Sequence, residues 1–292
     1  MGSKKLGFSC LEMIYSMDSE SLCGVVTIDD NSDKRSYFNE IRAFCFINKV
    51  PLYVAADNKH FNRLIKKIKP HKWFVVCWYW LIDKEILDMV PMGVIGIHNS
   101  LLPKYRGGSP LVWSIINGDE YVGSTIFSIT EDMDKGDIWA QTSIKLEFDH
   151  YVSDVLNILE DSIIQNFRNI IKNKITPTPQ NHDEATFCAQ RIPSDGKIDF
   201  NKNNIQVYNF IRAQSFPYPG AFTIYKNNEL IVLKAVPINI KCYGTPGQVF
   251  KINKEGVWVV CGNNDVIILK TVYFEECEVQ TNNVIKKFNW RF

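Results

Sequence analysis

The 292-residue chain lacks any apolar run long enough to cross a membrane. Its longest strongly apolar stretch, Trp73–Ile82, has about half of the ~20 residues that a spanning helix needs. The opening residues are soon followed by Glu12 and Asp18, so they do not form the apolar core of a signal peptide. Leu6 stands where a myristoylation signal has Ser or Thr. From these absences we expect a cytoplasmic protein without a membrane partner.

An excess of charge of one sign is also missing. The chain has 33 basic and 32 acidic side chains, which gives a formal net charge of +1 at pH 7. Proteins that bind nucleic acid gain much of their affinity from Lys and Arg side chains that neutralise phosphates. The balanced charge therefore disfavours nucleic acid as the main partner. With 46% hydrophobic and 22% charged residues, the composition is globular and excludes a disordered chain.

Closely spaced metal-ligand motifs are absent as well. The eight cysteines form no CxxC pair and have no histidine cluster beside them; they are Cys10, Cys23, Cys45, Cys77, Cys188, Cys242, Cys261 and Cys277. Cysteines scattered over a chain of this length are typical of reduced thiols that pack as small apolar residues. We therefore expect mostly buried free thiols, no disulfide and no metal site.

Short apolar segments and helical stretches alternate over the first 150 residues, which is typical of an α/β sheet. Such a domain normally opens with a strand, whereas this chain opens at a turn formed by Gly2 and Ser3. Either the sheet lacks this strand or the natural start lies upstream. Strands are predicted over 22–28, 50–54, 73–78, 94–98, 125–130 and 138–144, and helices over 9–17, 37–48, 61–69, 84–89, 111–117 and 152–172.

A segment with the sequence TPTPQ at 176–180 is typical of a linker and divides the chain. The predicted organisation is a Rossmann-like α/β domain over residues 1–180 and a small, mainly β, OB-like barrel over residues 181–292. The second domain is inferred from one helix and several short strands cut by turns: a helix over 205–214 and strands over 221–225, 230–236, 247–252, 257–260 and 266–269.

The segment between Gly93 and Gln141 contains the residues best suited to chemistry. His98 ends a predicted buried strand, and in an open α/β sheet ligands bind beyond the carboxyl ends of the strands. A histidine at that position can act as an acid or a base at neutral pH. Asp134 lies in the turn MDKGD between two strands, from where its carboxylate could orient His98. On the residues alone, a structural histidine and an ordinary turn aspartate remain the alternatives.

Three segments resemble, in this order, the signature of the folate-dependent formyltransferases: HNSLLPKYRGGSP (98–110), NGDEYVGSTIF (117–127) and MDKGDIWAQ (133–141). Residues 185–200 and 211–225 extend the resemblance into the second domain. It is closest to the nucleotide-sugar N-formyltransferases, among them those acting on UDP-4-amino-4-deoxy-L-arabinose. The resemblance implies 10-formyltetrahydrofolate as the formyl donor, a primary amine as the acceptor, and no metal.

The resemblance also implies a catalytic trio of Asn, His and Asp, with Asn two residues before His. His98 and Asp134 match this trio, but Gly96 occupies the asparagine position. Asn99 follows the histidine, and we hypothesise that it partly replaces the missing carboxamide. Strand alternation directs Asn99 to the opposite face, so capping of the turn is the alternative. Gly96 also leaves open a catalytically impaired relative that binds folate, and hydrolysis of the formyl donor is a third option.

By the same resemblance, folate would lie along a loop that contains Trp78, Tyr79 and Trp80, together with Thr130 and Asp132 of a second loop. For the aromatic side chains, packing in the core is the alternative. The sequence does not decide between these two roles.

Lys104, Tyr105 and Arg106 are placed by the resemblance where they would meet phosphates of the acceptor. The favoured acceptor is a dTDP- or UDP-linked amino sugar used for surface polysaccharide such as the lipopolysaccharide O-antigen. Methionyl-tRNA formyltransferase is the alternative, and two features disfavour it: the balanced charge and the short acidic stretch Asp29–Asp33, which would repel phosphates. A homodimer formed through the second domain is compatible with the sequence.

Overall fold

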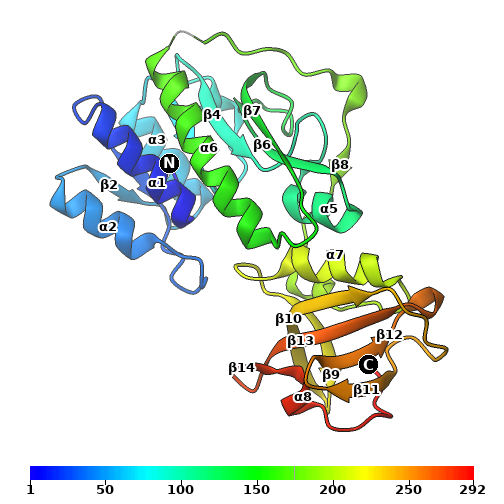
Figure 1. The fold of residues 1–292 in the computed structure, drawn as a ribbon. Coiled ribbons are helices and arrows are strands. Elements are labelled where there is room, and N and C mark those ends of the chain that lie inside the picture. Colours follow the sequence, from blue (N-terminus) through cyan, green and yellow to red (C-terminus); the bar gives the residue numbers. More distant parts are fainter. Residues whose placement is uncertain (174) are drawn as a thin grey trace. The chain divides into compact units, whose positions relative to one another are not determined.

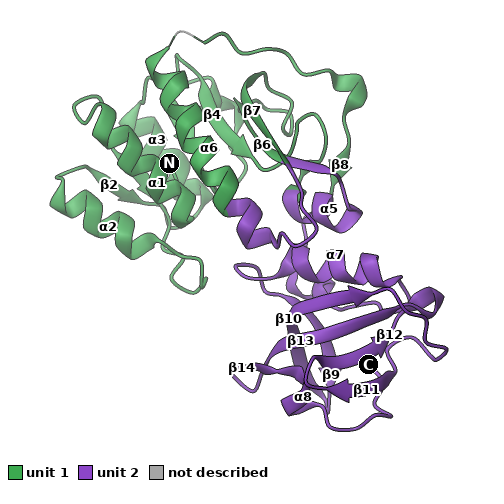
Figure 2. Cartoon of the chain, in the orientation of Figure 1, with its two compact units in different colours: residues 1–110, 123–144, 157–188 green, residues 111–122, 145–156, 189–292 purple. Residues whose placement is uncertain are grey.

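The computed structural model describes residues 1–173 and 175–292 and divides the chain into two compact units (Figure 2). The first unit comprises residues 1–110, 123–144 and 157–188; the second comprises residues 111–122, 145–156 and 189–292. The chain therefore passes between the units several times, and its last passage lies after residue 188, where the sequence predicted a single boundary at residue 180. The segment 181–188 stays with the first unit because its end, β8 (Phe187–Cys188), pairs in parallel with β5 (Arg106–Gly107).

Besides the β5–β8 pair, the first unit contains two groups of strands. β1 (Val25–Thr27) pairs in parallel with β2 (Leu52–Val54). In the second group, β3 and β4 run parallel, whereas β4 and β6 run antiparallel. The order of this group is β3 (Trp73–Val75), β4 (Val94–His98), β6 (Tyr121–Ser128) and β7 (Ile138–Lys145). Because β3 and β4 are parallel, both end at the edge where His98 lies.

The first three residues join these two groups of strands. The Gly2 amide donates to the carbonyl oxygen of Val26 in β1 at 3.1 Å, and Gly2 pairs in parallel with Val76 directly after β3. The Val76 amide donates in turn to the Met1 carbonyl oxygen at 3.0 Å. Residues 1–3 therefore occupy the position between β1 and β3 where the sequence predicted that a strand was missing.

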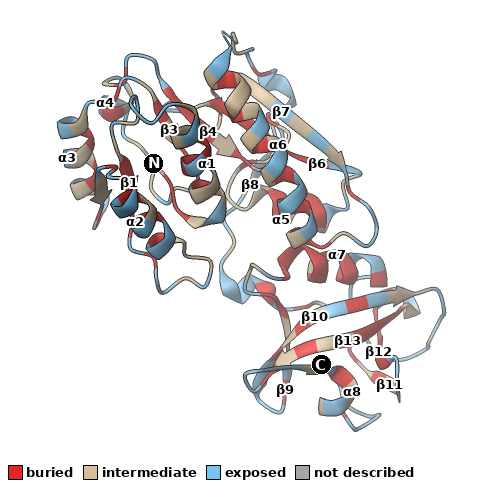
Figure 3. Ribbon diagram, turned by 60° about the vertical axis from the view of Figure 1, so that its left-hand side comes forward, coloured by how far each residue is buried: buried red, intermediate tan, exposed pale blue. Residues whose placement is uncertain are grey.

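Helices cover both faces of the sheet, because neighbouring residues of a strand point to opposite faces. Val25 packs in one apolar cluster with Leu11, while the next residue, Val26, packs in another with Phe61. Figure 1 shows α1 and α6 side by side, and the burial of β4 and β6 beneath the helices can be followed in Figure 3. The helices are α1 (Lys4–Met17), α2 (Phe38–Ile47), α3 (Asn58–Ile68), α4 (Lys84–Leu87) and α6 (Val152–Lys172).

The second unit contains an antiparallel sheet with the order β11-β12-β13-β10-β9, and β14 pairs with β13. Its main helix, α7 (Asn204–Gln214), begins at a capping box formed by Asn203 and Gln206. The α/β first domain and the β-rich second domain are thus confirmed. The remaining elements of this unit are α5 (Pro110–Asn117), β9 (Ala221–Tyr225), β10 (Asn228–Ile238), β11 (Val249–Asn253), β12 (Gly256–Val260), β13 (Val266–Phe274), β14 (Cys277–Gln280) and α8 (Thr281–Val284).

The eight cysteines are free, but the expectation that most are buried is wrong. Only three are buried, and three are exposed because they lie in loops or at a sheet edge: Cys23, Cys77 and Cys277. No helix within residues 1–173 and 175–292 combines the length and the apolar character that a membrane span requires. In the same described residues, no three His, Cys, Asp or Glu side chains are grouped to hold a metal ion.

Candidate active site

His98 is the last residue of β4 and lies against the neighbouring strand β6. Thr125 is its partner in the antiparallel register, and the Phe127 ring centroid is 6.3 Å from that of the imidazole. Only 8% of His98 is exposed. Since residues two apart in a strand share a face, Gly96 lies on the same face as His98. The candidate site is therefore built on this face of β4.

The hydrogen bond of His98 determines which ring nitrogen can accept a proton. Its Nε2 lies 2.7 Å from the carbonyl oxygen of Tyr105. A carbonyl oxygen only accepts, so Nε2 carries a hydrogen, and in the neutral ring Nδ1 is the nitrogen that can accept a proton. Nδ1 lies 3.6 Å from Oδ2 of Asp134. A proton taken up at Nδ1 would thus produce an imidazolium that faces a carboxylate.

Asp134 reaches His98 only because its loop folds back over the sheet. Ile95 pairs with Ser128 and His98 with Thr125, so the loop after β6 starts at the end of β4 opposite to His98. Asp134 itself has a left-handed backbone with φ of 53°. Its Oδ2 accepts a hydrogen bond of 2.8 Å from the Gly107 amide. The structure thus brings together the two side chains that the sequence placed in one site, although 36 positions separate them.

The space beside Gly96 is filled by an apolar side chain. A Cβ atom added at Gly96 would lie 2.7 Å from Cδ1 and 2.8 Å from Cγ1 of Ile129. Carbon atoms in contact normally lie about 3.5–4.0 Å apart. This side of His98 therefore presents Ile129 where the family resemblance implied a carboxamide, and it has no room for a longer side chain at position 96.

Asn99 does not take over that position. Its Oδ1 accepts a hydrogen bond of 3.2 Å from the Ser124 hydroxyl. Ser124 precedes Thr125, the partner of His98, so strand alternation places Ser124 and Asn99 on the face opposite to His98. The hypothesis that Asn99 swings back toward the histidine is therefore contradicted, because the hydrogen bond to Ser124 holds its carboxamide on the other face.

The aromatic residues proposed for folate separate into two roles. Trp78 and Trp80 pack against the core cluster around Phe61, with ring centroids 5.0 Å and 6.3 Å from the Phe61 ring. The core-packing alternative therefore describes both tryptophans. Tyr79 is 47% exposed, and its hydroxyl donates to Asp30 at 3.0 Å. In the same loop Leu81 is 85% exposed, and it is an apolar residue that the sequence did not single out.

Thr130 and Asp132 lie on the exposed part of the loop that carries Asp134. The Thr130 hydroxyl donates to the Asp132 carbonyl oxygen at 3.2 Å, and the Asp132 carboxylate pairs with Lys135 at 3.1 Å. Met133, the next residue, is 50% exposed. These contacts shape the loop and leave an apolar side chain uncovered beside Asp134.

The three residues expected to meet phosphates are placed differently from one another. Lys104 is exposed, and Tyr105 uses its backbone to hold His98. Arg106, in contrast, is only 1% exposed. Its Nη2 donates to Oε1 of Gln180 at 2.6 Å and to Nδ1 of His182 at 2.8 Å. The prediction that Arg106 binds the acceptor is therefore contradicted, because its guanidinium is enclosed by the chain's own side chains.

Gln180 is the site residue that the sequence interpretation missed. It ends the segment predicted to be a linker, but this segment runs beside β7: the amides and carbonyl oxygens of Thr178 and Ile138 exchange hydrogen bonds of 2.8 Å and 2.9 Å. Further along, the Thr186 hydroxyl accepts from the Tyr105 amide at 2.9 Å. The segment predicted to be a linker therefore packs against the elements that form the site. The local sequence TPTPQ does not predict such long-range contacts.

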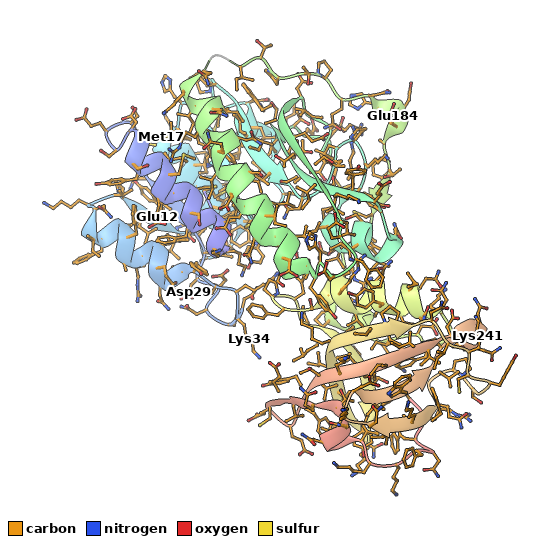
Figure 4. The ribbon with its side chains drawn as sticks, viewed as in Figure 1. Glu12, Met17, Asp29, Lys34, Glu184 and Lys241 are labelled. Atoms are coloured by element: carbon orange, nitrogen blue, oxygen red, sulfur yellow. The ribbon has the colours of Figure 1, made fainter. Side chains whose placement is uncertain are left out.

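The acidic loop after β1, marked by the labels of Asp29 and Lys34 in Figure 4, is neutralised internally. Lys4 Nζ lies 2.6 Å from Asp30 and 2.7 Å from Asp33. Burial acts to raise the pKa of Asp30, but hydrogen bonds from Lys4 and Ser3 outweigh it and hold that pKa below its usual range. Two of the three carboxylates in this stretch, those of Asp30 and Asp33, thus already have cationic partners, so the stretch repels phosphates less than its sequence implies.

Two family models match the chain. One describes formyl transferases and matches residues 18–165; the other describes the formyl transferase C-terminal domain and matches residues 192–288. A methionyl-tRNA formyltransferase of Clostridioides difficile is 31% identical over 277 residues, which cover 92% of this chain and 89% of that protein. The two models together cover both predicted domains.

The chain is also similar to two proteins that are not named methionyl-tRNA formyltransferase. The bifunctional polymyxin resistance protein ArnA of Wigglesworthia glossinidia brevipalpis is 30% identical over 98% of this chain, which spans 44% of the length of ArnA. The crystal structure of an N-formyltransferase from Helicobacter canadensis, with folinic acid and dTDP-3-aminofucose, superposes with a TM-score of 0.69 at 20% identity. That comparison covers 92% of this chain and 96% of the other and shows a shared fold.

Proposed function

Because this chain belongs to the formyltransferase family, it is an enzyme that transfers formyl groups, and we propose a specific donor and acceptor. The donor is 10-formyltetrahydrofolate, and the acceptor is the primary amine of a dTDP- or UDP-linked amino sugar used for surface polysaccharide. The chemistry rests on one observation, the free Nδ1 of His98 facing Asp134 at 3.6 Å. The choice of a sugar over tRNA rests on the net charge of +1, since a tRNA ligand calls for a basic surface.

His98 supports the transfer as a general base. An amine must be neutral to attack the formyl carbon, so its proton passes to Nδ1 while the new C–N bond forms. The resulting imidazolium is stabilised by the Asp134 carboxylate. When the bond between the formyl carbon and the folate nitrogen breaks, the imidazolium returns the proton to that nitrogen. Nε2 keeps its hydrogen bond to Tyr105 throughout, which holds the ring in one orientation.

The loop after β3 and the loop that carries Asp134 offer surface for the donor. Leu81, after β3, and Met133, next to Asp134, are apolar side chains that the protein leaves 85% and 50% exposed. An aromatic ring system such as a pterin can cover apolar surface of this kind. Trp78 and Trp80 shape the loop from the core, because they pack on Phe61. The backbone of this loop and the two exposed side chains are therefore the groups we assign to folate.

The oxyanion of the tetrahedral intermediate has one donor fewer than the family resemblance implied. Gly96 supplies none, and Ile129 fills the adjoining space. One preorganised donor is worth ~3–4 kcal/mol in acyl-transfer enzymes, which corresponds to about 10²- to 10³-fold in rate. We therefore propose an enzyme that turns over slowly, and the impaired folate-binding relative is the second candidate that this observation favours.

Release of tetrahydrofolate tests the proposal directly. The chain is supplied with 10-formyltetrahydrofolate and, in separate reactions, dTDP- and UDP-linked 3-amino and 4-amino sugars or methionyl-tRNA. Release that depends on an amino sugar, with a mass increase of the sugar by one formyl group, supports the proposal. Release with methionyl-tRNA alone replaces it by the tRNA activity of the C. difficile relative, and release without any acceptor indicates donor hydrolysis.

Two histidine variants, one in the site and one outside it, test whether the measured release depends on His98. His98→Gln removes the base, so acceptor-dependent release should fall by about 10²- to 10⁴-fold. His71→Gln changes an exposed histidine outside the site and should leave the rate unchanged. If folate binds but no amine is formylated by the unaltered chain, the impaired-relative candidate stands and the proposed activity is rejected.

A further inference from the structure

A network of polar contacts lies behind Asp134 within the first unit. Gln180 is 6% exposed, and its Nε2 donates to two main-chain carbonyl oxygens, that of Asp134 at 2.8 Å and that of Gly136 at 2.7 Å. Its Oε1 accepts from Nη2 of Arg106 at 2.6 Å. The same Nη2 also donates to His182. One amide thus connects the former linker, the β4–α5 segment and the loop that carries Asp134.

The chemistry of the partners permits only one orientation of this amide. A guanidinium only donates and a carbonyl oxygen only accepts. Gln180 must therefore turn its oxygen toward Arg106 and its nitrogen toward Asp134 and Gly136. Among uncharged side chains of this length, glutamine alone supplies an acceptor and two donors at its tip. Arg106 is thus the group that keeps both N–H bonds of Gln180 directed at the loop.

The loop needs this support because of the way it approaches His98. It leaves β6 at Ser128, opposite Ile95, and must return along about three strand residues, or roughly 10 Å, to bring Asp134 to the imidazole. The left-handed conformation of Asp134, with φ of 53°, is disfavoured for a residue that is not glycine. Gln180 and the Gly107 amide supply contacts that hold this backbone in place.

We propose that Gln180 is a positioning residue for formyl transfer: by holding the carbonyl oxygens of Asp134 and Gly136, it fixes the Asp134 carboxylate beside Nδ1 of His98. The expected loss of kcat rests on the proposed function, whereas the expected change at His98 rests on the geometry alone. Gln180 touches no reacting atom, so it acts through Asp134.

Few other charged groups face His98. Arg106 directs its guanidinium to Gln180 and His182, away from the imidazole. Cys188 lies near the carbonyl oxygen of Tyr105, with Sγ at 3.4 Å, and burial raises the pKa of this thiol to about 11, so it stays neutral between pH 5 and pH 9. Within the described residues, Asp134 is therefore the charged group whose displacement should change the protonation of His98.

Two substitutions remove the donors of Gln180 in different ways. Gln180→Leu removes all three contacts, while Gln180→Glu keeps the acceptor for Arg106 and replaces the donors by a carboxylate oxygen that repels the two carbonyl oxygens. Both should lower kcat by about tenfold to thirtyfold with little change in KM, because the base and not the binding surface is affected. Gln141→Leu, which removes two hydrogen bonds of a side-chain amide to Leu102 and Thr125, is the control for the loss of amide hydrogen bonds.

Protonation of His98 provides a readout that needs no acceptor. In protein labelled at histidine, the signal of His98, assigned by its loss in His98→Gln, is followed by NMR as a function of pH. A displaced carboxylate stabilises the imidazolium less, so protonation should move to lower pH by roughly half to one pH unit in both Gln180 variants. The Gln141→Leu control should titrate like the unaltered chain.

A double-mutant cycle with Asp134→Asn completes the test. If Gln180 acts through Asp134, Gln180→Leu should have little further effect on His98 once the carboxylate is gone. If the melting curve shows that Gln180→Leu does not fold, the titration of His98 is measured in Gln180→Glu instead. A folded Gln180 variant that titrates like the unaltered chain overturns the inference, as does an effect that persists undiminished in Asp134→Asn. Absence of turnover with every acceptor rejects the proposed function but leaves the NMR result decisive for Gln180.

Discussion

Replacing Gly96 with alanine tests whether Ile129 has closed the space beside His98. The new Cβ would lie 2.7 Å from Cδ1 of Ile129, well inside contact distance. Adding a carbon to a packed site costs about 1–3 kcal/mol, and the stiffer unfolded chain offsets about 0.4–1 kcal/mol of this. The net expectation is a loss of about 1–2 kcal/mol, or roughly 2–8 °C in melting temperature at ~2–4 °C per kcal/mol.

Shortening Ile129 should remove this conflict. Ile129→Ala deletes both atoms that the added Cβ would meet, so Gly96→Ala should cost nothing measurable in the Ile129→Ala background. Calorimetry of the four proteins in this cycle provides the free energies. In the same background, Gly96→Asn would place a carboxamide on the His98 face, and kcat for formyl transfer should rise by about tenfold or more.

Two results would refute this reasoning. If Gly96→Ala melts at the temperature of the unaltered chain, then Ile129 does not occupy the space. If the cost of Gly96→Ala is equal with and without the Ile129 side chain, the destabilisation has another source. If Gly96→Asn folds in the Ile129→Ala background but kcat does not rise, the oxyanion is stabilised by another group.

Three further predictions concern residues near this site and the loop after β1. His98→Gln should reduce kcat by about 10²- to 10⁴-fold without lowering the melting temperature by more than a few degrees, as tetrahydrofolate release and calorimetry will show. Arg106→Met should destabilise the chain by about 1–3 kcal/mol in urea unfolding, because it leaves the buried acceptor Oε1 of Gln180 unpaired. Lys4→Met should cost about 1–3 kcal/mol at pH 7. Since the folded state lowers the pKa of Asp30 and of Asp33, this contribution is present at neutral pH and declines as acid protonates the two carboxylates, so the stability difference between the two proteins should shrink with falling pH in urea titrations.

Much of the fold was predictable because its elements depend on local patterns. The apolar segments with β-branched residues became β1 to β4, and the helical repeat over 152–172 became α6 with the same bounds. His98 and Asp134 could each be singled out because strand ends and turns have characteristic residues. These features are encoded by neighbours in the sequence.

What could not be predicted depends on contacts between distant segments. Arg106 looked like an exposed loop charge, and only the return of residues 178–188 along β7 and β5 encloses it. Asn99 could have turned toward His98 until the register of β4 with β6 placed it beside Ser124. The role of residues 1–3 as the join between β1 and β3 also follows from pairing and not from composition.

That short join has a consequence for cooperativity. Beyond the helix packing, few backbone hydrogen bonds of residues 1–3 connect β1 and β2 to the strands that carry His98. Regions coupled by few such bonds open at lower free energy than the core they adjoin. Val26 of β1, however, packs in one apolar cluster with Val75 of β3 and Val94 of β4, so side-chain packing more than backbone pairing keeps the half of the sheet with β1 and β2 cooperative with the strands that carry His98.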